Sequence, residues 1–91
     1  MYRVDYSHAA HRDLERLVRR IPPEHARAIL AAVNSLADEP RPTAAIKLGS
    51  PLDLYRLRVR AYRVVYVVDD PAQLVLVTRI ARRAEGTYRG L

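Results

Sequence analysis

Three arginines alternate with apolar residues in the second half of the chain, at positions Arg56, Arg58 and Arg60. A β-strand places every second side chain on the same face, so these guanidinium groups would stand about 7 Å apart in a row. Like charges arranged in this way repel one another unless an anion bridges them. The pattern therefore predicts either a solvated strand face that resists edge-to-edge aggregation or a binding site for a polyanion.

Further arginines stand where neighbouring strands would bring them to one end of a sheet. Arg63 begins the next apolar run, and Arg79, Arg82 and Arg83 close the last one. In an antiparallel meander the start of one strand lies beside the end of the next, so we expect Arg63 and Arg82 to converge. Arg82 shares the parity of Ile80, and its direction depends on whether the strand has ended or bulged before it.

The positive charge of the chain is concentrated in residues 55–91. The 91 residues carry 16 Lys and Arg against 10 Asp and Glu, a formal net charge of +6, and residues 55–91 account for +5 of it with eight arginines and three acids. The planar guanidinium group of arginine can donate two parallel hydrogen bonds to a phosphate. Three tyrosines, Tyr55, Tyr62 and Tyr88, lie between the arginines in the sequence. A GC-rich genome would explain the choice of arginine over lysine but not the clustering, which predicts a site for a polyanion, nucleic acid above all.

Several classes of protein are excluded by what the sequence lacks. The absence of cysteine excludes a disulfide framework, a thiolate zinc site and a cysteine nucleophile. No apolar run approaches the ~18 residues of a membrane span, and the N-terminal residues lack the apolar region of a signal peptide. We therefore expect one cytoplasmic domain over residues 1–91, without membrane contact and without a metal or cofactor.

Three histidines, His8, His11 and His25, suggest a second chemistry. A pair of histidines can perform acid–base catalysis in a metal-free ribonuclease or hold zinc. These three lie among charged residues near helix ends, remote from the arginines, and no third metal ligand is evident. We therefore expect them on the exposed surface.

A short strand and two amphipathic helices are expected in the first half of the chain. The alternation of residues 2–6 predicts the strand, and Ser7 can cap a helix whose apolar face extends to Ile21. Two prolines end this helix, and Pro23 suits the first position of a second helix that runs to Glu39. The two helices would form a hairpin with one apolar face to bury.

Three strand-like runs are expected in the second half, after a connecting loop. Residues 41–51 contain the prolines and glycine of a loop. Residues 54–60, 62–69 and 74–80 are alternating, β-branched or aromatic, and their short connections predict an antiparallel meander. One face would pack on the helical hairpin and the other would carry the arginines. The expected fold class is α+β, with the order β-α-α-β-β-β.

The motifs of the chain resemble those of the RelE/ParE superfamily of bacterial toxins. The string LYRLRVRAYRVVYVVDD, followed by RIARRAEGTYR, carries the resemblance, together with the strand, two helices and EPRP…KL that precede the sheet. The resemblance covers essentially the whole chain and implies a fold similar to that of microbial ribonucleases. Members of the RelE branch cut mRNA in the ribosomal A site and are silenced by a cognate antitoxin that wraps the toxin.

The resemblance also implies a catalytic role for three residues. Arg63 matches the family arginine that holds the scissile phosphate, and Arg82 matches the cationic or histidine position that stabilises or protonates the leaving group. Tyr88 matches the tyrosine that stacks on a base and helps to orient the ribose 2′-OH. Arg56 and Arg58 stand where the best-studied branch has lysines.

The remaining candidates for substrate binding are Arg60, Arg83 and Lys47. Arg60 and the following Ala61 occupy positions that are often Gly-Asp in relatives, which leaves the geometry of the turn open. Lys47 matches the KL that precedes the sheet in the family, where it would touch RNA or simply be solvated.

The implied reaction is attack of a ribose 2′-OH on the adjacent phosphate, which requires no metal. It needs positive charge around the phosphorane and groups that move two protons. A guanidinium group cannot act as a base at pH 7, so arginine in place of lysine at positions 56 and 58 removes one candidate base. Tyr88 would need its pKa lowered by the surrounding arginines to serve instead.

Two other functions within the same superfamily stay open. The chain could be a ParE-like inhibitor of DNA gyrase that does not cleave RNA, or a nucleic-acid or antitoxin-binding module without activity. The co-occurrence of Arg63, Arg82 and Tyr88 favours the ribosome-dependent mRNA endoribonuclease. For any toxin of this kind we expect an acidic antitoxin that covers the arginine face or displaces the tail around Tyr88.

Overall fold

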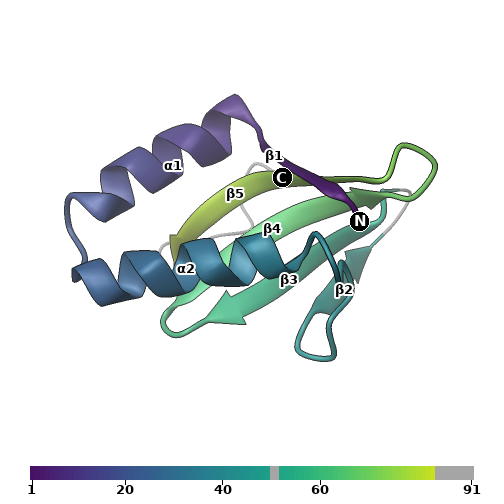
Figure 1. Ribbon diagram of the computed structural model, residues 1–91. Coiled ribbons are helices and arrows are strands. Elements are labelled where there is room, and N and C mark those ends of the chain that lie inside the picture. Colours follow the sequence, from purple (N-terminus) through teal and green to yellow (C-terminus); the bar gives the residue numbers. More distant parts are fainter. Residues whose placement is uncertain (50–51, 84–91) are drawn as a thin grey trace.

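The computed structural model of the chain describes residues 1–49 and 52–83. Seven helices and strands follow one another along it (Figure 1), namely β1 (Arg3–Tyr6), α1 (His8–Val18), α2 (Pro23–Ser35), β2 (Ile46–Gly49), β3 (Leu54–Val59), β4 (Tyr62–Asp69) and β5 (Leu74–Arg82). This arrangement confirms the predicted α+β class. No helix within the described ranges is long and apolar enough to cross a membrane.

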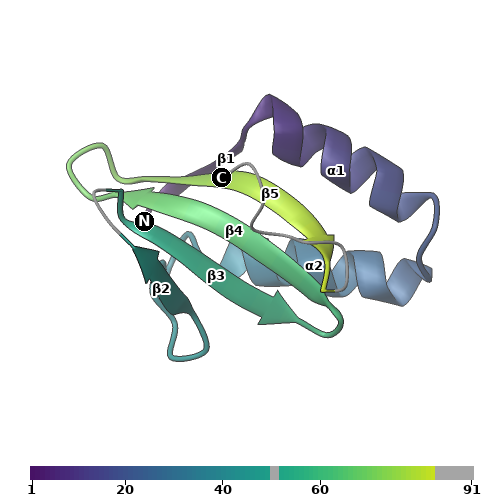
Figure 2. The same ribbon diagram turned by 180° about the vertical axis from the view of Figure 1, so that it is seen from behind.

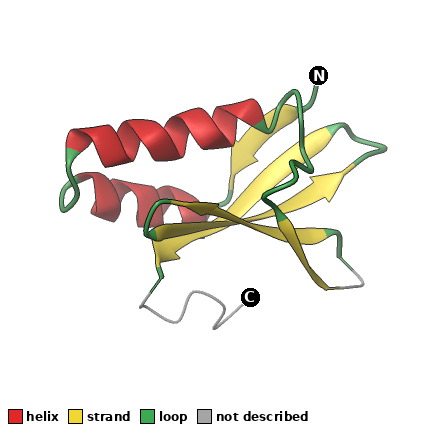
Figure 3. Ribbon diagram, turned by 90° about the horizontal axis from the view of Figure 1, so that it is seen from below, coloured by secondary structure: helices red, strands yellow, loops and turns green. Residues whose placement is uncertain are grey.

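The strands form one five-stranded sheet in the order β1-β5-β4-β3-β2. β3, β4 and β5 make the predicted antiparallel meander, while β1 pairs with β5 in parallel, so the sheet as a whole is mixed. Both helices lie on one side of the sheet, which is seen from its helix side in Figure 1 and from behind in Figure 2. Figure 3 shows the helices and the strands as two layers.

The predicted loop over residues 41–51 contains a strand that the sequence analysis did not anticipate. β2 pairs antiparallel with β3, with Ile46 opposite Arg56 and Lys47 opposite Tyr55. Residues 46–48 lack proline, so their backbone groups are available to pair with the otherwise unpaired edge of β3. The order is therefore β-α-α-β-β-β-β rather than the predicted β-α-α-β-β-β.

The helices begin where the sequence predicts and end earlier. The Ser7 hydroxyl accepts a hydrogen bond from the Ala10 N–H at 3.1 Å, and Pro23 opens α2. α1 ends at Val18, which is 46% exposed, whereas Ile21 lies beyond the helix and is buried. Ile21 is buried like the apolar residues of α1 and fits their spacing. The predicted apolar face therefore extended past the true end of the helix.

The hydrophobic core lies between the helices and one face of the sheet. α1, α2 and the segments that follow them contribute apolar side chains, and alternate residues of three strands meet them, namely Tyr55, Leu57, Tyr62, Val64, Tyr66, Val68, Val75, Val77 and Ile80. Tyr62 and Tyr66 are the largest fully buried side chains. Because successive residues of a strand point to opposite faces, the residues between these core positions lie on the face without helices, which we call the open face.

A bulge in β5 changes which face its last residues occupy. Val65 pairs with Arg79 and Tyr66 pairs with Val77, so Thr78 is an extra residue in β5. The Thr78 hydroxyl donates to the Val65 carbonyl at 3.2 Å. The extra residue reverses the parity of the strand, which turns Ile80 into the core.

α1 covers the edge of β5 beyond the end of β1. The Ser7 N–H donates to the Val77 carbonyl at 2.9 Å, and the Ser7 hydroxyl donates to the Thr78 carbonyl at 3.1 Å. The Ile80 N–H donates to the Asp13 carboxylate at 2.9 Å. These three backbone groups at the edge of β5 are thus satisfied by α1 and its cap, which fixes α1 against the strand.

A polar cluster around Arg41 ties together four distant segments. The Arg41 guanidinium donates to Asp53, to Asp70 at 2.8 Å and to the Tyr55 hydroxyl at 2.8 Å. The Tyr2 hydroxyl also donates to Asp70. This Arg41 cluster joins the residue before β1, the loop before β2, the start of β3 and the turn after β4.

Candidate nucleic-acid interface

Arginines from two neighbouring strands meet on the open face. Arg58 lies directly opposite Arg63, and Arg56 lies opposite Val65, which is two residues further along β4. Side chains at such positions share a face, and directly opposed residues have Cβ atoms about 5 Å apart. The structure therefore brings Arg56, Arg58 and Arg63 together, as the strand pattern predicts.

Arg63 is a buried cation with unsatisfied hydrogen-bonding capacity. It is only 6% exposed, and its Nη1 has no hydrogen-bond partner in the part of the chain that the structure describes. A buried charged group normally has its donors satisfied, because an unmade hydrogen bond to a charged group costs several kcal/mol. The free position on Nη1 requires an acceptor, and Arg58 lies directly opposite Arg63. An anion would supply that acceptor and would also match the local positive charge.

Arg82 lies at the same end of the sheet as Arg63 but on the opposite face. It pairs with Tyr62, and its guanidinium carbon lies 5.9 Å from the centre of the Tyr62 ring, on the side of the sheet that faces the helices. Arg63 and Arg82 therefore meet at one end of the sheet as predicted, and the direction of Arg82, which the sequence left open, is toward the helix side. The bulge at Thr78 is the reason, since without it Arg82 would have the parity of the open face.

Two other predicted substrate contacts do not join the arginines of the open face. Lys47 lies opposite Tyr55, a core residue, and its Nζ is 3.4 Å from the Asp53 carboxylate. Arg60 forms the turn between β3 and β4 with a φ of 55°, a left-handed conformation that glycine adopts at lower cost. This explains why glycine suits that turn.

The last predicted residues lie at or beyond the end of β5. The Arg83 N–H donates to the Ala61 carbonyl at 2.9 Å, which continues the pairing of β4 and β5 by one step, and the Arg83 side chain is exposed. Tyr88 lies outside the described residues.

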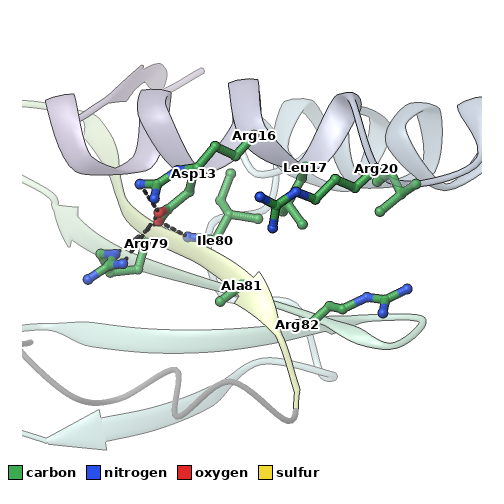
Figure 4. A pocket seen from close by; sticks show the side chains of 9 residues that line it. Asp13, Arg16, Leu17, Arg20, Arg79, Ile80, Ala81 and Arg82 are labelled. Carbon is green, nitrogen blue, oxygen red and sulfur yellow. Dashed lines mark hydrogen bonds and ion pairs between the residues drawn. The ribbon is translucent and has the colours of Figure 1, made fainter.

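A basic cavity of about 300 Å³ lies between α1 and the end of β5 (Figure 4). Four arginines and one acid line it, together with four apolar residues. The charged residues are Asp13, Arg16, Arg20, Arg79 and Arg82. Arg16 and Arg20 were not among the predicted site residues; Arg16 lies in the last turn of α1 and Arg20 in the turn after it.

Asp13 organises the wall of this cavity. Its carboxylate accepts from Arg79 Nε at 2.9 Å, from Arg79 Nη2 at 3.3 Å and from the Ile80 N–H, and it lies 3.9 Å from Arg16 (Figure 4). The hydrogen bonds to Asp13 raise the pKa of Arg79 above its ordinary value. Asp13 is itself buried, and these donors compensate its negative charge.

The histidines are only partly as predicted. His8 and His11 are exposed, but His25 is half-buried and its Nδ1 lies 3.0 Å from the Tyr62 hydroxyl, with the two rings edge to face. The prediction that all three lie on the exposed surface is therefore wrong for His25. Its partner, Tyr62, is the residue whose ring contacts Arg82.

One family model and several solved structures are similar to this chain over most of its length. A family model described as the ParE toxin of type II toxin–antitoxin systems (parDE) matches residues 4–86. A chain of the archaeal RelE–RelB complex from Pyrococcus horikoshii OT3 is 31% identical, with a TM-score of 0.77, over 92% of this chain and 97% of that chain. No curated protein matched the chain in a sequence search.

Two bacterial structures are also similar. A chain of the RelBE2 toxin–antitoxin complex from Mycobacterium tuberculosis is 27% identical with a TM-score of 0.73, over 90% of this chain and 98% of that chain. The isolated RelE toxin of E. coli is 24% identical with a TM-score of 0.73, over 90% of this chain and 84% of that chain. At that identity the E. coli structure supports the fold alone.

Proposed function

This chain belongs to the RelE/ParE superfamily and is a toxin of a type II toxin–antitoxin system, and we propose that it acts as a ribosome-dependent mRNA endoribonuclease. The observation that carries the proposal is the buried Arg63, whose Nη1 lacks a hydrogen-bond partner among the described residues and which stands opposite Arg58. The Arg63 guanidinium therefore offers a phosphodiester both positive charge and an unused donor.

In the proposed reaction the ribose 2′-oxygen forms a bond to the adjacent phosphorus, and the bond from phosphorus to the 5′-oxygen breaks. The 2′-hydroxyl loses its proton and the leaving 5′-oxygen gains one, which yields a 2′,3′-cyclic phosphate and a 5′-hydroxyl. Arg63 and Arg58 stabilise the additional negative charge of the phosphorane, which is the largest requirement of such a transition state. They cannot accept the proton, because guanidinium remains protonated at neutral pH.

The structure changes which arginines we assign to this phosphate. Arg82 contacts Tyr62 on the face that packs against the helices, so we do not assign it to the leaving group of a phosphate bound on the open face. Arg58 and Arg56 take its place as the cations nearest to Arg63 in the register of the sheet. Tyr88 stays a proposed positioning residue for the ribose.

We propose an acidic antitoxin as the partner that silences the toxin. The similar archaeal and mycobacterial structures are toxin–antitoxin complexes. An acidic segment over Arg63 would satisfy the same Nη1 donor as a phosphate and would exclude RNA from the open face.

A ParE-like activity is the second candidate, because the matching family model is described as a ParE toxin. The separation of Arg82 from Arg63 also removes part of the pattern that favours a ribonuclease. Under this alternative the chain would inhibit DNA gyrase by protein contact and would leave mRNA intact.

Primer extension on mRNA in a translating extract, paired with a gyrase cleavage assay, separates these functions. We expect cuts at codon positions, with yields at least ~100-fold lower for Arg63→Ala if Arg63 stabilises the transition state. Arg12→Ala is the matched control, because Arg12 is exposed on α1 and lies on neither the open face nor the cavity. Gyrase-dependent DNA breaks with intact mRNA would replace the proposal with the second candidate. Neither activity would indicate a binding module.

A further inference from the structure

The cavity between α1 and β5 gathers positive charge at the edge of the sheet, apart from the Arg58 and Arg63 positions that the proposed reaction uses. Arg16 comes from the last turn of α1 and Arg20 from the turn that follows it, while Arg79 and Arg82 come from the end of β5 (Figure 4). The one acid among the lining residues is buried and already hydrogen-bonded to Arg79 and to the backbone of β5. An anion entering the cavity would therefore meet an excess of cations.

We propose that this cavity binds a second phosphate group of the RNA, so that one strand passes from the open face around the end of β5. The inference rests on the proposed function only in naming RNA as the source of the phosphate. The size of the cavity, about 300 Å³, greatly exceeds the ~30 Å³ that one water molecule takes up and leaves room for a hydrated phosphate.

The arrangement of the arginines favours a phosphate over a carboxylate. A carboxylate is planar, and a single guanidinium fork can match both of its oxygens. A phosphate directs its oxygens in several directions, and the cavity offers donors from a helix on one side and from a strand on the other. Arg82 is further held by its contact with the Tyr62 ring, whose hydroxyl is hydrogen-bonded to His25.

The register of the sheet connects this cavity to the open face. Ala81 lies opposite Arg63, and the next residue of β5, Arg82, lies opposite Tyr62. The two proposed phosphate positions are thus reached from consecutive residues at the same end of one strand. A single polyanion at this end of the sheet would therefore be close to both positions.

A binding experiment without ribosomes tests the inference separately from cleavage. The probe is a fluorescently labelled 2′-O-methyl dodecauridylate, which cannot undergo 2′-OH attack, and its affinity for the full-length chain is measured by anisotropy over a series of salt concentrations. Arg20→Gln removes one cation of the cavity, Arg58→Gln removes one of the open face, and Arg12→Gln is the control with the same loss of charge.

We expect Arg20→Gln to reduce the slope of log affinity against log salt by about 0.7 and to weaken binding about fivefold at 0.1 M salt, as loss of one phosphate contact should. Arg12→Gln should remain within twofold of the parent chain. Equal behaviour of Arg20→Gln and Arg12→Gln, with a loss only for Arg58→Gln, would overturn the inference and leave the proposed function intact.

Two further results separate the remaining alternatives. A loss for Arg20→Gln but none for Arg58→Gln would support the cavity and count against the open face as the site of the proposed reaction. A labelled oligoglutamate of the same length that binds as tightly as the RNA, and depends equally on Arg20, would overturn the assignment to phosphate in favour of an acidic protein segment.

Discussion

At the scale of single residues, two buried charged groups have opposite characters. Asp13 is surrounded by donors from Arg79 and the backbone of Ile80, as a structural carboxylate should be. Arg63 is equally buried, yet its Nη1 lacks a partner among the described residues and an arginine lies opposite. The first arrangement stabilises the fold, and the second leaves a hydrogen bond unmade at some cost in stability, which we propose that a phosphate satisfies when RNA binds.

Replacing Asp13 should therefore destabilise the protein. Asp13→Ala removes the acceptor of the Ile80 N–H and leaves Arg79 without its carboxylate, so we expect a loss of about 2–3 kcal/mol in the free energy of unfolding. Urea denaturation measures the change. Glu15→Ala, an exposed acid on the same helix, is the control and should have little effect. A loss below ~0.5 kcal/mol for Asp13→Ala would show that α1 does not depend on this contact.

Replacing Arg63 should have the opposite effect on stability. Arg63→Met fills a similar volume without a buried charge, so we expect the free energy of unfolding to stay equal or rise by about 1 kcal/mol while mRNA cleavage is lost. The same urea series measures stability, and primer extension measures cleavage. A clearly destabilised Arg63→Met variant would make Arg63 a structural residue.

At the scale of helices and strands, local patterns predicted β1, both helices and the antiparallel meander of β3, β4 and β5, but missed β2 and the bulge in β5. The alternation of residues 54–59 and the β-branched run of residues 62–69 gave β3 and β4 nearly residue by residue, because strand pairing follows that period. The bulge at Thr78 has no such local signal, since it depends on contacts of β5 with β4 and α1. That one extra residue decides which face Arg82 occupies.

The Arg41 cluster is the element-scale feature with a defined pH dependence. Hydrogen bonds from Arg41 lower the pKa of Asp53 and of Asp70 below the ordinary 3.8, with Tyr2 also contributing at Asp70. A lowered pKa in the folded state favours folding while the carboxyl is ionised. This contribution is present above the unfolded value and is lost as pH falls through the folded values.

We therefore expect the urea midpoint of the protein to fall as pH decreases from about 5 to 2, and to fall less steeply in Arg41→Ala. Arg27→Ala, which removes an exposed arginine of α2, is the control and should keep the steeper dependence of the parent protein. Equal pH dependence in Arg41→Ala and the parent protein would remove the Arg41 cluster as its source.

At the scale of the whole molecule, the fold divides its arginines between two faces. The sheet presents Arg56, Arg58 and Arg63 on the open face, and the bulged end of β5 meets α1 to form the basic cavity. The excess charge of residues 55–91 predicted a polyanion site but not its division, because Arg16 and Arg20, which line the cavity with Arg82, lie more than sixty residues earlier in the chain. A long-range contact of this kind has no signature in a single sequence.

The most direct test of the proposed phosphate site is a cryo-electron microscopy structure of the toxin on a ribosome carrying mRNA with 2′-deoxy nucleotides in the A site. Loss of the 2′-hydroxyl prevents cleavage and preserves the complex. We predict a phosphate oxygen of the A-site codon about 2.8 Å from Arg63 Nη1, with Arg58 beside it. A bound toxin whose Arg63 faces no phosphate would contradict the proposal.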